Sequence, residues 1–155
     1  ILASLVGSEM CIRDRDVANG IADAAEIFNV GIFGMVNTFH EKVYKERGVK
    51  FYGEFYSDLE YDETGYLVIA KGRNQYYPTD RAVDRCMRAI KENKVQTIQG
   101  NDVDVGCETI CVHSDTPNAI EILKALRENI SPKKNSSEKS TNGNHSKMPY
   151  IIDKK

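Results

Sequence analysis

Stretches whose apolar residues recur at helical spacing alternate along this chain with short, continuous apolar runs. In the clearest case, a helical pattern over residues 17–28 leads directly into the run VGIFGMV at residues 30–36. Helical spacing predicts a helix with one apolar face, and a short apolar run beside turn residues predicts a buried strand. Strands that are separated by helices lie parallel and join through right-handed crossovers. We therefore expect an α/β fold with a parallel sheet, either closed as a barrel or open.

The segment after the first strand carries signals for both ends of a helix. Thr38 and Glu41 match the capping-box pattern, in which two side chains satisfy N–H groups of the first turn. Gly48 can adopt the left-handed conformation that ends many helices, so a helix is expected from Thr38 to Arg47. His40 then lies in the first turn, where an exposed polar role is favoured over a role as ligand or base.

Two more helices are expected later in the chain, each with a capping residue at its start. Thr79 or Asp80 is predicted to cap the first, and Thr116, followed by Pro117, the second. The second is expected to bury a mostly apolar stripe made of Ile120, Leu123, Arg127 and Ile130. Strands are expected at residues 49–56, 95–98 and 109–113, with a hairpin or loop excursion around the turn at 62–65 and another turn at 99–102.

Two of the expected strands place polar side chains near their carboxyl ends. Because side chains alternate along a strand, residues 49, 51 and 55 share one face and residues 52, 54 and 56 the other. In the last strand Ile110 and Val112 share one face, and Cys111, His113 and, if the chain stays extended, Asp115 share the other. In α/β folds the carboxyl edge of the sheet is where sites are built. A site is therefore predicted there.

Length, charge and cysteine content exclude several classes of protein. A chain of 155 residues, 41% of them hydrophobic, can bury one core, and it has no run of about 18 apolar residues that would cross a membrane. Residues 16–130 hold 13 Lys and Arg against 19 Asp and Glu, a net charge of −6, which disfavours a nucleic-acid partner. The chain is expected to be soluble and cytoplasmic. Cys107, Cys111 and His113 lack the paired spacing of a zinc site, so buried thiols are favoured there.

The two ends of the chain are expected to lie outside the fold. Residues 5–14, LVGSEMCIRD, match the translation of a sequencing-adapter DNA, so residues 1–15 are predicted to be an adapter-derived artefact that replaces the natural N-terminal part. Residues 131–155 are rich in Ser, Lys, Asn and Gly and are predicted to form a disordered polar tail. The folded domain is then expected at residues 16–130.

Two segments carry a resemblance to a known family. Residues 110–119, ICVHSDTPNA, resemble the motif ICVHGDTPGA of the LamB/YcsF family and differ from it at Ser114 and Asn118. Residues 54–61, EFYSDLEY, are similar to the family's EVFADRAY, with Leu59 in place of Arg. Together the segments resemble the eukaryotic, especially fungal, branch called lactam utilisation proteins. The family's earlier motifs, such as DLNCDMGE, are not present in this sequence.

The resemblance implies a fold and an activity. The fold would be the C-terminal part of a seven-stranded β/α barrel of the glycoside hydrolase/deacetylase type. The activity would be hydrolysis of a 5-oxoproline-type lactam coupled to ATP, with the chain as the A subunit of a 5-oxoprolinase whose other subunits are its partners. Without the earlier motifs, the chain alone is expected to be inactive.

The resemblance also implies site residues, because carboxylates and an imidazole suit lactam hydrolysis as bases, cation ligands or hydrogen-bond partners. His113 and Asp115 are the first candidates for catalytic residues, followed by Glu54 and Asp58. Two alternatives remain open for the function. One is a substrate-binding subunit without chemistry of its own. The other, by analogy of fold, is a carbohydrate deacetylase or hydrolase that would use a divalent metal.

Overall fold

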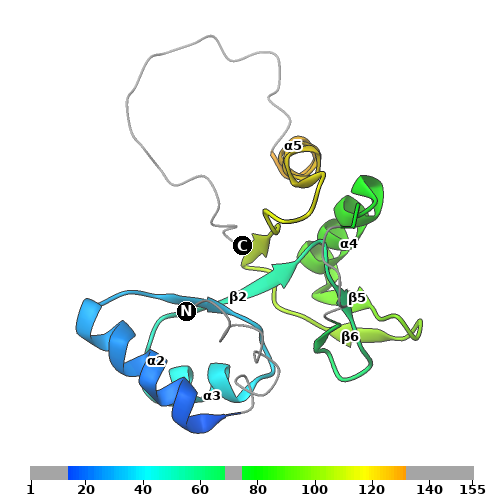
Figure 1. Ribbon diagram of the computed structural model, residues 1–155. Helices are drawn as coiled ribbons and strands as arrows, with labels where there is room; N and C mark the ends of the chain where they lie inside the picture. Colours follow the sequence, from blue (N-terminus) through cyan, green and yellow to red (C-terminus); the bar gives the residue numbers. More distant parts are fainter. Residues whose placement is uncertain (1–13, 69–74, 132–155) are drawn as a thin grey trace, which may run out of the picture.

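The computed structural model describes residues 14–68 and 75–131 (Figure 1). The predictions for residues 1–13 and for the tail after residue 131 lie outside this range. In chain order the elements are α2 (Arg15–Phe28), β1 (Ile32–Gly34), α3 (Phe39–Glu46), β2 (Phe51–Tyr56), β3 (Glu60–Tyr61), β4 (Leu67–Val68), α4 (Thr79–Glu92), β5 (Lys94–Gln96), β6 (Asp102–Asp104), β7 (Thr109–Cys111) and α5 (Ala119–Ile130). In this part of the chain no helix is both long and apolar enough to cross a membrane.

The sheet that organises the fold consists of three parallel strands in the order β1-β2-β7, which confirms the expected α/β class. The central strand β2 pairs with β1 through residues 51–53 and with β7 through residues 54–56. Figure 1 shows β2 running from the α2–α3 end of the molecule toward α4. Because its two neighbours pair with successive halves of the strand, they are staggered along it.

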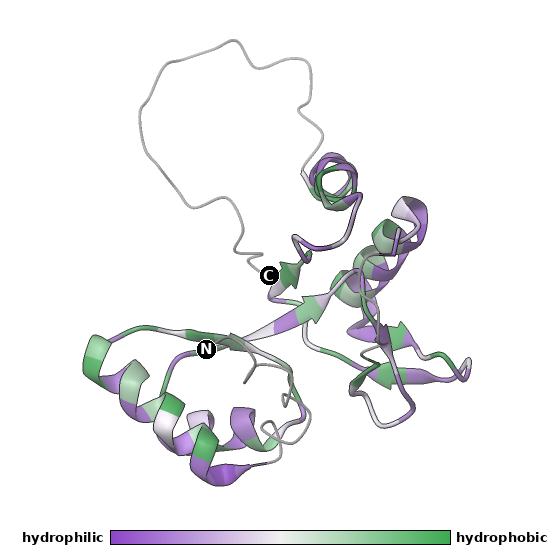
Figure 2. Cartoon of the chain, in the orientation of Figure 1, coloured by the Kyte–Doolittle hydropathy of each residue, from purple (hydrophilic) through white to green (hydrophobic). Residues whose placement is uncertain are grey.

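Two separate apolar cores lie at the two ends of β2. The smaller core joins α2 to α3 and is made of Ala18, Ala22, Val43 and Tyr44, with Ile32, Val49 and Phe51 against it. The larger core lies under α4 and α5 and includes Phe55, Tyr61, Cys86, Val95 and Ile122, all at most 2% exposed. In Figure 2 apolar and polar residues both occur along each of these helices, as expected for helices that bury one face.

Strand β1 departs from its prediction as a buried strand. Phe33 is 58% exposed, and its ring contacts Tyr52 of β2 with 5.3 Å between ring centroids. The small core contacts the other face of the strand, through Ile32. Strand β1 is therefore covered on one face. A continuous apolar run in the sequence cannot by itself distinguish a strand that is covered on one face from a strand that is buried on both faces.

The predicted hairpin is present as the antiparallel pair β3–β4, whereas strand β6 was not expected. Strand β6 pairs with β5 in a second hairpin across the predicted turn, where Gly100 has a φ of 94°. Its sequence, Asp-Val-Asp, offers one apolar residue between two charged ones. Such a short segment carries too little hydrophobic pattern to be identified without its partner.

Helix α3 follows its capping signals closely. The Thr38 hydroxyl oxygen accepts a hydrogen bond from the Glu41 N–H at 3.2 Å, and Gly48 has a φ of 72° just after the helix. The Glu41 carboxylate accepts from the N–H of Asn37 at 2.5 Å, one residue before the position that a capping box predicts. The predicted helix is therefore confirmed.

The predicted caps of the other two helices are wrong. Helix α4 has Pro78 at its N-cap, and the Thr79 hydroxyl donates to Glu121 of α5 at 2.8 Å. Helix α5 has Asn118 at its N-cap, two residues after the expected cap Thr116. In both cases the threonine hydroxyl has a partner far away in sequence, and this tertiary hydrogen bond replaces the local one.

The expected buried stripe of α5 is also wrong in orientation. Ile120 and Leu123 are 65% and 48% exposed, while the adjacent stripe Ala119, Ile122 and Leu126 is buried. The helix sequence offers two neighbouring apolar stripes. Packing against α4 and the larger core selects between them.

Candidate functional site

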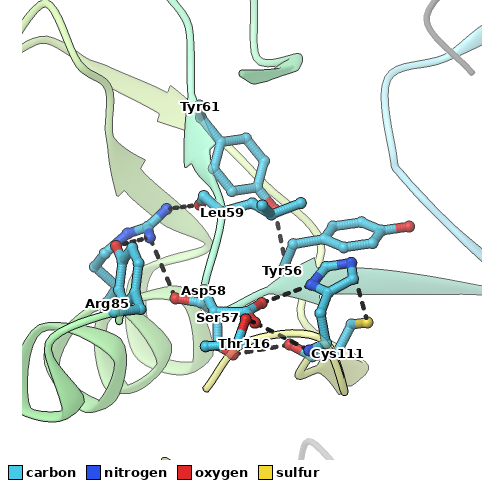
Figure 3. Close-up of polar contacts among 10 residues, drawn as sticks. Tyr56, Ser57, Asp58, Leu59, Tyr61, Arg85, Cys111 and Thr116 are labelled. Carbon is cyan, nitrogen blue, oxygen red and sulfur yellow. Dashed lines mark hydrogen bonds and ion pairs between the residues drawn. The ribbon is translucent and has the colours of Figure 1, made fainter. Parts of the chain in front are cut away.

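Asp58 and His113 form a hydrogen-bonded pair at the carboxyl ends of two neighbouring strands. Figure 3 labels Asp58 with its neighbours Ser57, Cys111 and Thr116. Asp58 lies in the turn after β2, and His113 lies two residues after β7. The His113 Nδ1 is 2.7 Å from Asp58 Oδ1, and the His113 main-chain N–H donates to Asp58 Oδ2 at 3.0 Å. The Asp58 side chain is completely buried, and that of His113 is 20% exposed. The pair therefore combines a fixed carboxylate with an imidazole that solvent can reach.

Two hydroxyl groups hold the surrounding turns together. Thr116 donates to Asp58 Oδ2 at 2.5 Å, so the carboxylate has three donors. Ser57 donates from its N–H and its hydroxyl to the carbonyl oxygen of Cys111, at 3.1 and 2.8 Å. These bonds continue the β2–β7 pairing by one residue and bring the Asp58 turn next to His113.

The other faces of the imidazole meet a thiol and an aromatic ring. Cys111 Sγ lies 4.0 Å from His113 Nε2. The Tyr56 ring stacks on the imidazole, with 6.0 Å between centroids and an angle of 20° between planes. Tyr56 is fixed in turn, because its main-chain N–H donates to the Tyr61 hydroxyl oxygen at 3.0 Å. The ring orientation of His113 is thus set on several sides.

The hydrogen bonds at this site favour the charged forms of both partners. The hydrogen bond to Asp58, followed by that to Cys111, raises the pKa of His113 from 6.5 to about 10. Burial acts to raise the pKa of Asp58, but the hydrogen bonds from His113 and Thr116 outweigh it and lower the pKa below its ordinary value. At neutral pH the site therefore holds an imidazolium beside a carboxylate. Such an imidazolium can donate a proton.

The other two predicted site residues lie apart from this pair. Glu54 is in β2 opposite Thr109. Burial, followed by the charge of Glu54 and a hydrogen bond to it, raises the pKa of the Tyr56 hydroxyl, so Glu54 reaches the site through Tyr56. Asp115 is exposed, and it precedes the α5 N-cap by three residues, too far to act as an anion in the first turn of that helix. The structure pairs His113 with Asp58.

Sequence reasoning missed the site roles of Thr116 and Cys111. Thr116 has the pattern of a helix cap, and its contact with Asp58 spans 58 residues of sequence. The alternation of side chains along the last strand did place Cys111 on the same face as His113. This alternation is the signal in the sequence that indicates the position of Cys111 beside His113.

Of the cysteines considered as zinc ligands, Cys107 is buried, at 1% exposed, as was favoured for these thiols. Cys111 is half-buried beside His113. Within residues 14–68 and 75–131 no three His, Cys, Asp or Glu side chains form a metal-binding group.

Comparison with known proteins identifies relatives of the chain. It is 32% identical over 120 residues to the A subunit of 5-oxoprolinase from Oceanobacillus iheyensis, a match that covers 76% of this chain and 47% of the relative. It is 34% identical over 124 residues to the same subunit from Alkaliphilus metalliredigens, covering 78% of this chain and 48% of the relative. The chain thus spans about half the length of these curated relatives.

A solved structure shares the fold as well as the sequence. The crystal structure of the lactam utilization protein from Thermus thermophilus matches with a TM-score of 0.67 and 28% sequence identity, over 77% of this chain and 48% of that one. The model of the LamB/YcsF family matches residues 7–145, most of the chain. On this evidence the chain belongs to the LamB/YcsF family.

Proposed function

We propose that this chain contributes the Asp58–His113 part of an active site that opens a 5-oxoproline-type lactam, in a reaction coupled to ATP hydrolysis and carried out with partner subunits. The observation that carries the proposal is the imidazole of His113, partly open to solvent and held by a buried carboxylate. The names of the relatives support the choice of a lactam as substrate.

The proposed role of His113 follows from the chemistry of ring opening. A lactam is a stable amide, and its C–N bond breaks only when the carbonyl carbon is attacked and the departing ring nitrogen gains a proton. An imidazolium can supply that proton, and a buried aspartate keeps the imidazole oriented and charged. Coupling to ATP makes attack by water feasible, because phosphorylation of the lactam oxygen, with release of ADP, turns a poor electrophile into a better one. The phosphate leaves as the carboxylate of the product forms. His113 is thus assigned as general acid and Asp58 as the residue that orients it.

The residues around the pair do not fit a nucleotide or a divalent metal ion. Both oxygens of Asp58 already accept hydrogen bonds. The Arg85 guanidinium, which contacts the Asp58 turn from α4, donates to the carbonyl oxygens of Ser57 and Leu59 and to the Tyr77 hydroxyl. Its terminal nitrogens are therefore already bonded within the chain. We therefore assign ATP and any metal to none of the described residues of this chain. In the proposal ATP is a substrate of the whole enzyme.

The proposal includes the barrel that the family resemblance implies. Strands in a barrel tilt and shift relative to one another. The stagger of β1 and β7 along β2 has this character and supports a barrel that this chain forms in part.

A histidine NMR titration tests the substrate. Adding 5-oxoproline to chain labelled with 15N at histidine is expected to shift the His113 resonances and to leave those of His40, which contacts Tyr44, unchanged. Asp58→Asn should abolish the shift. In assays with partner subunits and ATP, His113→Gln and Asp58→Asn should each reduce glutamate release at least about 100-fold, the usual size of a general-acid contribution.

The same assay separates Asp115 from the pair. Asp115 is exposed, so Asp115→Asn should keep the folding stability of the wild type. The turnover of this variant shows whether the Asp115 carboxylate also takes part in the reaction. The proposal is wrong if 5-oxoproline moves neither His113 resonance and turnover survives in His113→Gln.

A further inference from the structure

Arg85 is a charged residue in the interior of the protein. It lies in the middle of α4 and is 8% exposed, whereas Arg81 and Arg88 of the same helix pair with acidic residues nearer the surface. Its two terminal nitrogens reach out of the helix to the turn that follows β2. NH1 donates to the carbonyl oxygen of Ser57 at 3.2 Å, and NH2 donates to that of Leu59 at 2.6 Å. These two carbonyls flank Asp58 on either side (Figure 3).

The guanidinium group is largely removed from water, which is costly for a charge. The rings of Phe55, Tyr61 and Tyr77 lie 5.7 Å from its central carbon and offset part of this cost as cation–π contacts. The Arg85 Nε is buried and has no hydrogen-bond partner among the described residues. An apolar side chain of similar volume avoids both the desolvation of the charge and the unsatisfied N–H. What such a side chain cannot do is hold two main-chain carbonyls at once.

The Asp58 turn needs this kind of support. The Asp58 carboxylate meets three donors on a segment 55 to 58 residues away, each within 3.0 Å. A rotation of either peptide plane beside Asp58 would move the carboxylate out of reach of these donors. Residues that touch a reacting group are commonly oriented by a second layer of hydrogen bonds of this type.

We propose that Arg85 is a positioning residue for the Asp58–His113 pair, which it holds in register by fixing the main chain on both sides of Asp58. The inference rests on the proposed function only in regarding this pair as the reacting groups. Arg85 acts through Asp58 and is not assigned a contact with substrate.

The test is the titration of His113, followed by NMR of the chain without substrate. Asp58, Cys111 and Tyr56 face this imidazole. In Arg85→Met the Asp58 carboxylate should lose its fixed position, so the titration midpoint of His113 should fall by about one pH unit or more toward the ordinary 6.5. Arg85→Lys keeps the charge with a single nitrogen and should give a smaller fall.

Arg88→Met is the matched control, because Arg88 lies on the same helix but pairs with Asp102 and Glu92. It should leave the His113 midpoint unchanged. Circular dichroism melts establish which variants are folded. A folded Arg85→Met with the wild-type midpoint would overturn the proposal. If Arg85→Met does not fold, the His113 midpoint of Arg85→Lys decides: a wild-type midpoint would overturn the proposal. If neither variant folds, the proposal is also overturned, because Arg85 then supports the whole fold.

Failure of this inference can be told apart from failure of the proposed function. The His113 titration uses no lactam, so it can succeed while 5-oxoproline binding fails. In the opposite case, lactam binding at His113 with a titration that does not respond to Arg85 would overturn the positioning role alone.

Discussion

A single carboxylate, that of Asp58, joins two segments that lie 55 residues apart in the sequence. It does so without exposure to solvent, because its three donors replace the water that an ionised carboxylate requires. Removing one of these donors would leave part of a buried charge unsatisfied. The pair therefore couples the chemistry of the site to the stability of the fold.

This coupling predicts how stability depends on pH. The pKa of His113 is raised to about 10, so its pairing stabilises the fold fully below about pH 6.5 and is lost as pH rises through about 10. The pKa of Asp58 is lowered, so its contribution is present above its ordinary value of 3.8 and is lost as pH falls through the lowered value. The pair should therefore stabilise the fold most between about pH 3.8 and about pH 6.5.

Urea unfolding of wild type and His113→Gln at pH 7 and pH 10.5 measures this effect. Wild type should lose only about 2 kcal/mol more than the variant between the two pH values, because solvent weakens the pairing of the partly exposed His113 side chain. Titration of Lys and Tyr residues elsewhere contributes equally to both proteins. Equal losses in the two proteins would show that His113 does not hold a raised pKa.

At the scale of elements, Asn118 connects the starts of α4 and α5. Its side-chain oxygen accepts from the Tyr77 N–H at 3.1 Å, and its side-chain nitrogen donates to the Tyr77 carbonyl at 2.8 Å and to the Thr79 hydroxyl at 3.1 Å. The residue is 8% exposed.

Asn118→Ala is predicted to lower the free energy of unfolding by about 2 kcal/mol, because it leaves the half-buried N–H and carbonyl of Tyr77 without their partner. Asn129→Ala is the matched control in the same helix, since Asn129 donates to the Ala125 carbonyl within α5 at an exposed position. Its effect should stay within about 0.5 kcal/mol. Equal effects of the two substitutions in urea titrations would contradict the role of Asn118.

At the scale of the whole molecule, β2 joins two cores whose buried residues form separate clusters. Each core is covered by its own pair of helices, α2 with α3 and α4 with α5. A residue of one core and a residue of the other therefore belong to clusters that have no buried residue in common. The effects on stability of substituting two such residues should add.

A double-mutant cycle of Val43→Ala and Ile122→Ala tests this independence. Each substitution should cost about 1 to 4 kcal/mol, and the double mutant should equal their sum within about 0.5 kcal/mol. The control cycle joins Phe55→Leu and Tyr61→Leu, whose rings stack at 5.6 Å and should show a coupling of about 1 kcal/mol. Strong coupling between Val43 and Ile122 would mean that the two cores pack as one.

The success of prediction from sequence varied with the range of the interaction. Helix α3, the β3–β4 hairpin and the parallel strands followed from caps, turns and periodicity, which act within a few residues. The starts of α4 and α5 did not, because Thr79 and Thr116 bond to Glu121 and Asp58, far away in sequence. For the site, alternation placed His113 on the correct face, but it could not choose between Asp115 and Asp58 as its partner.

The sequence by itself determined the α/β class, the order of most elements and the strand ends at which polar side chains gather, because backbone hydrogen bonding and side-chain alternation are local. Tertiary structure decided which apolar stripe of α5 is buried, that Asp58 pairs with His113, and that Arg85 lies behind the Asp58 turn. These outcomes depend on the register between β2 and β7 and on the packing of α4. Both are fixed only when distant segments compete for the same buried donors and the same core.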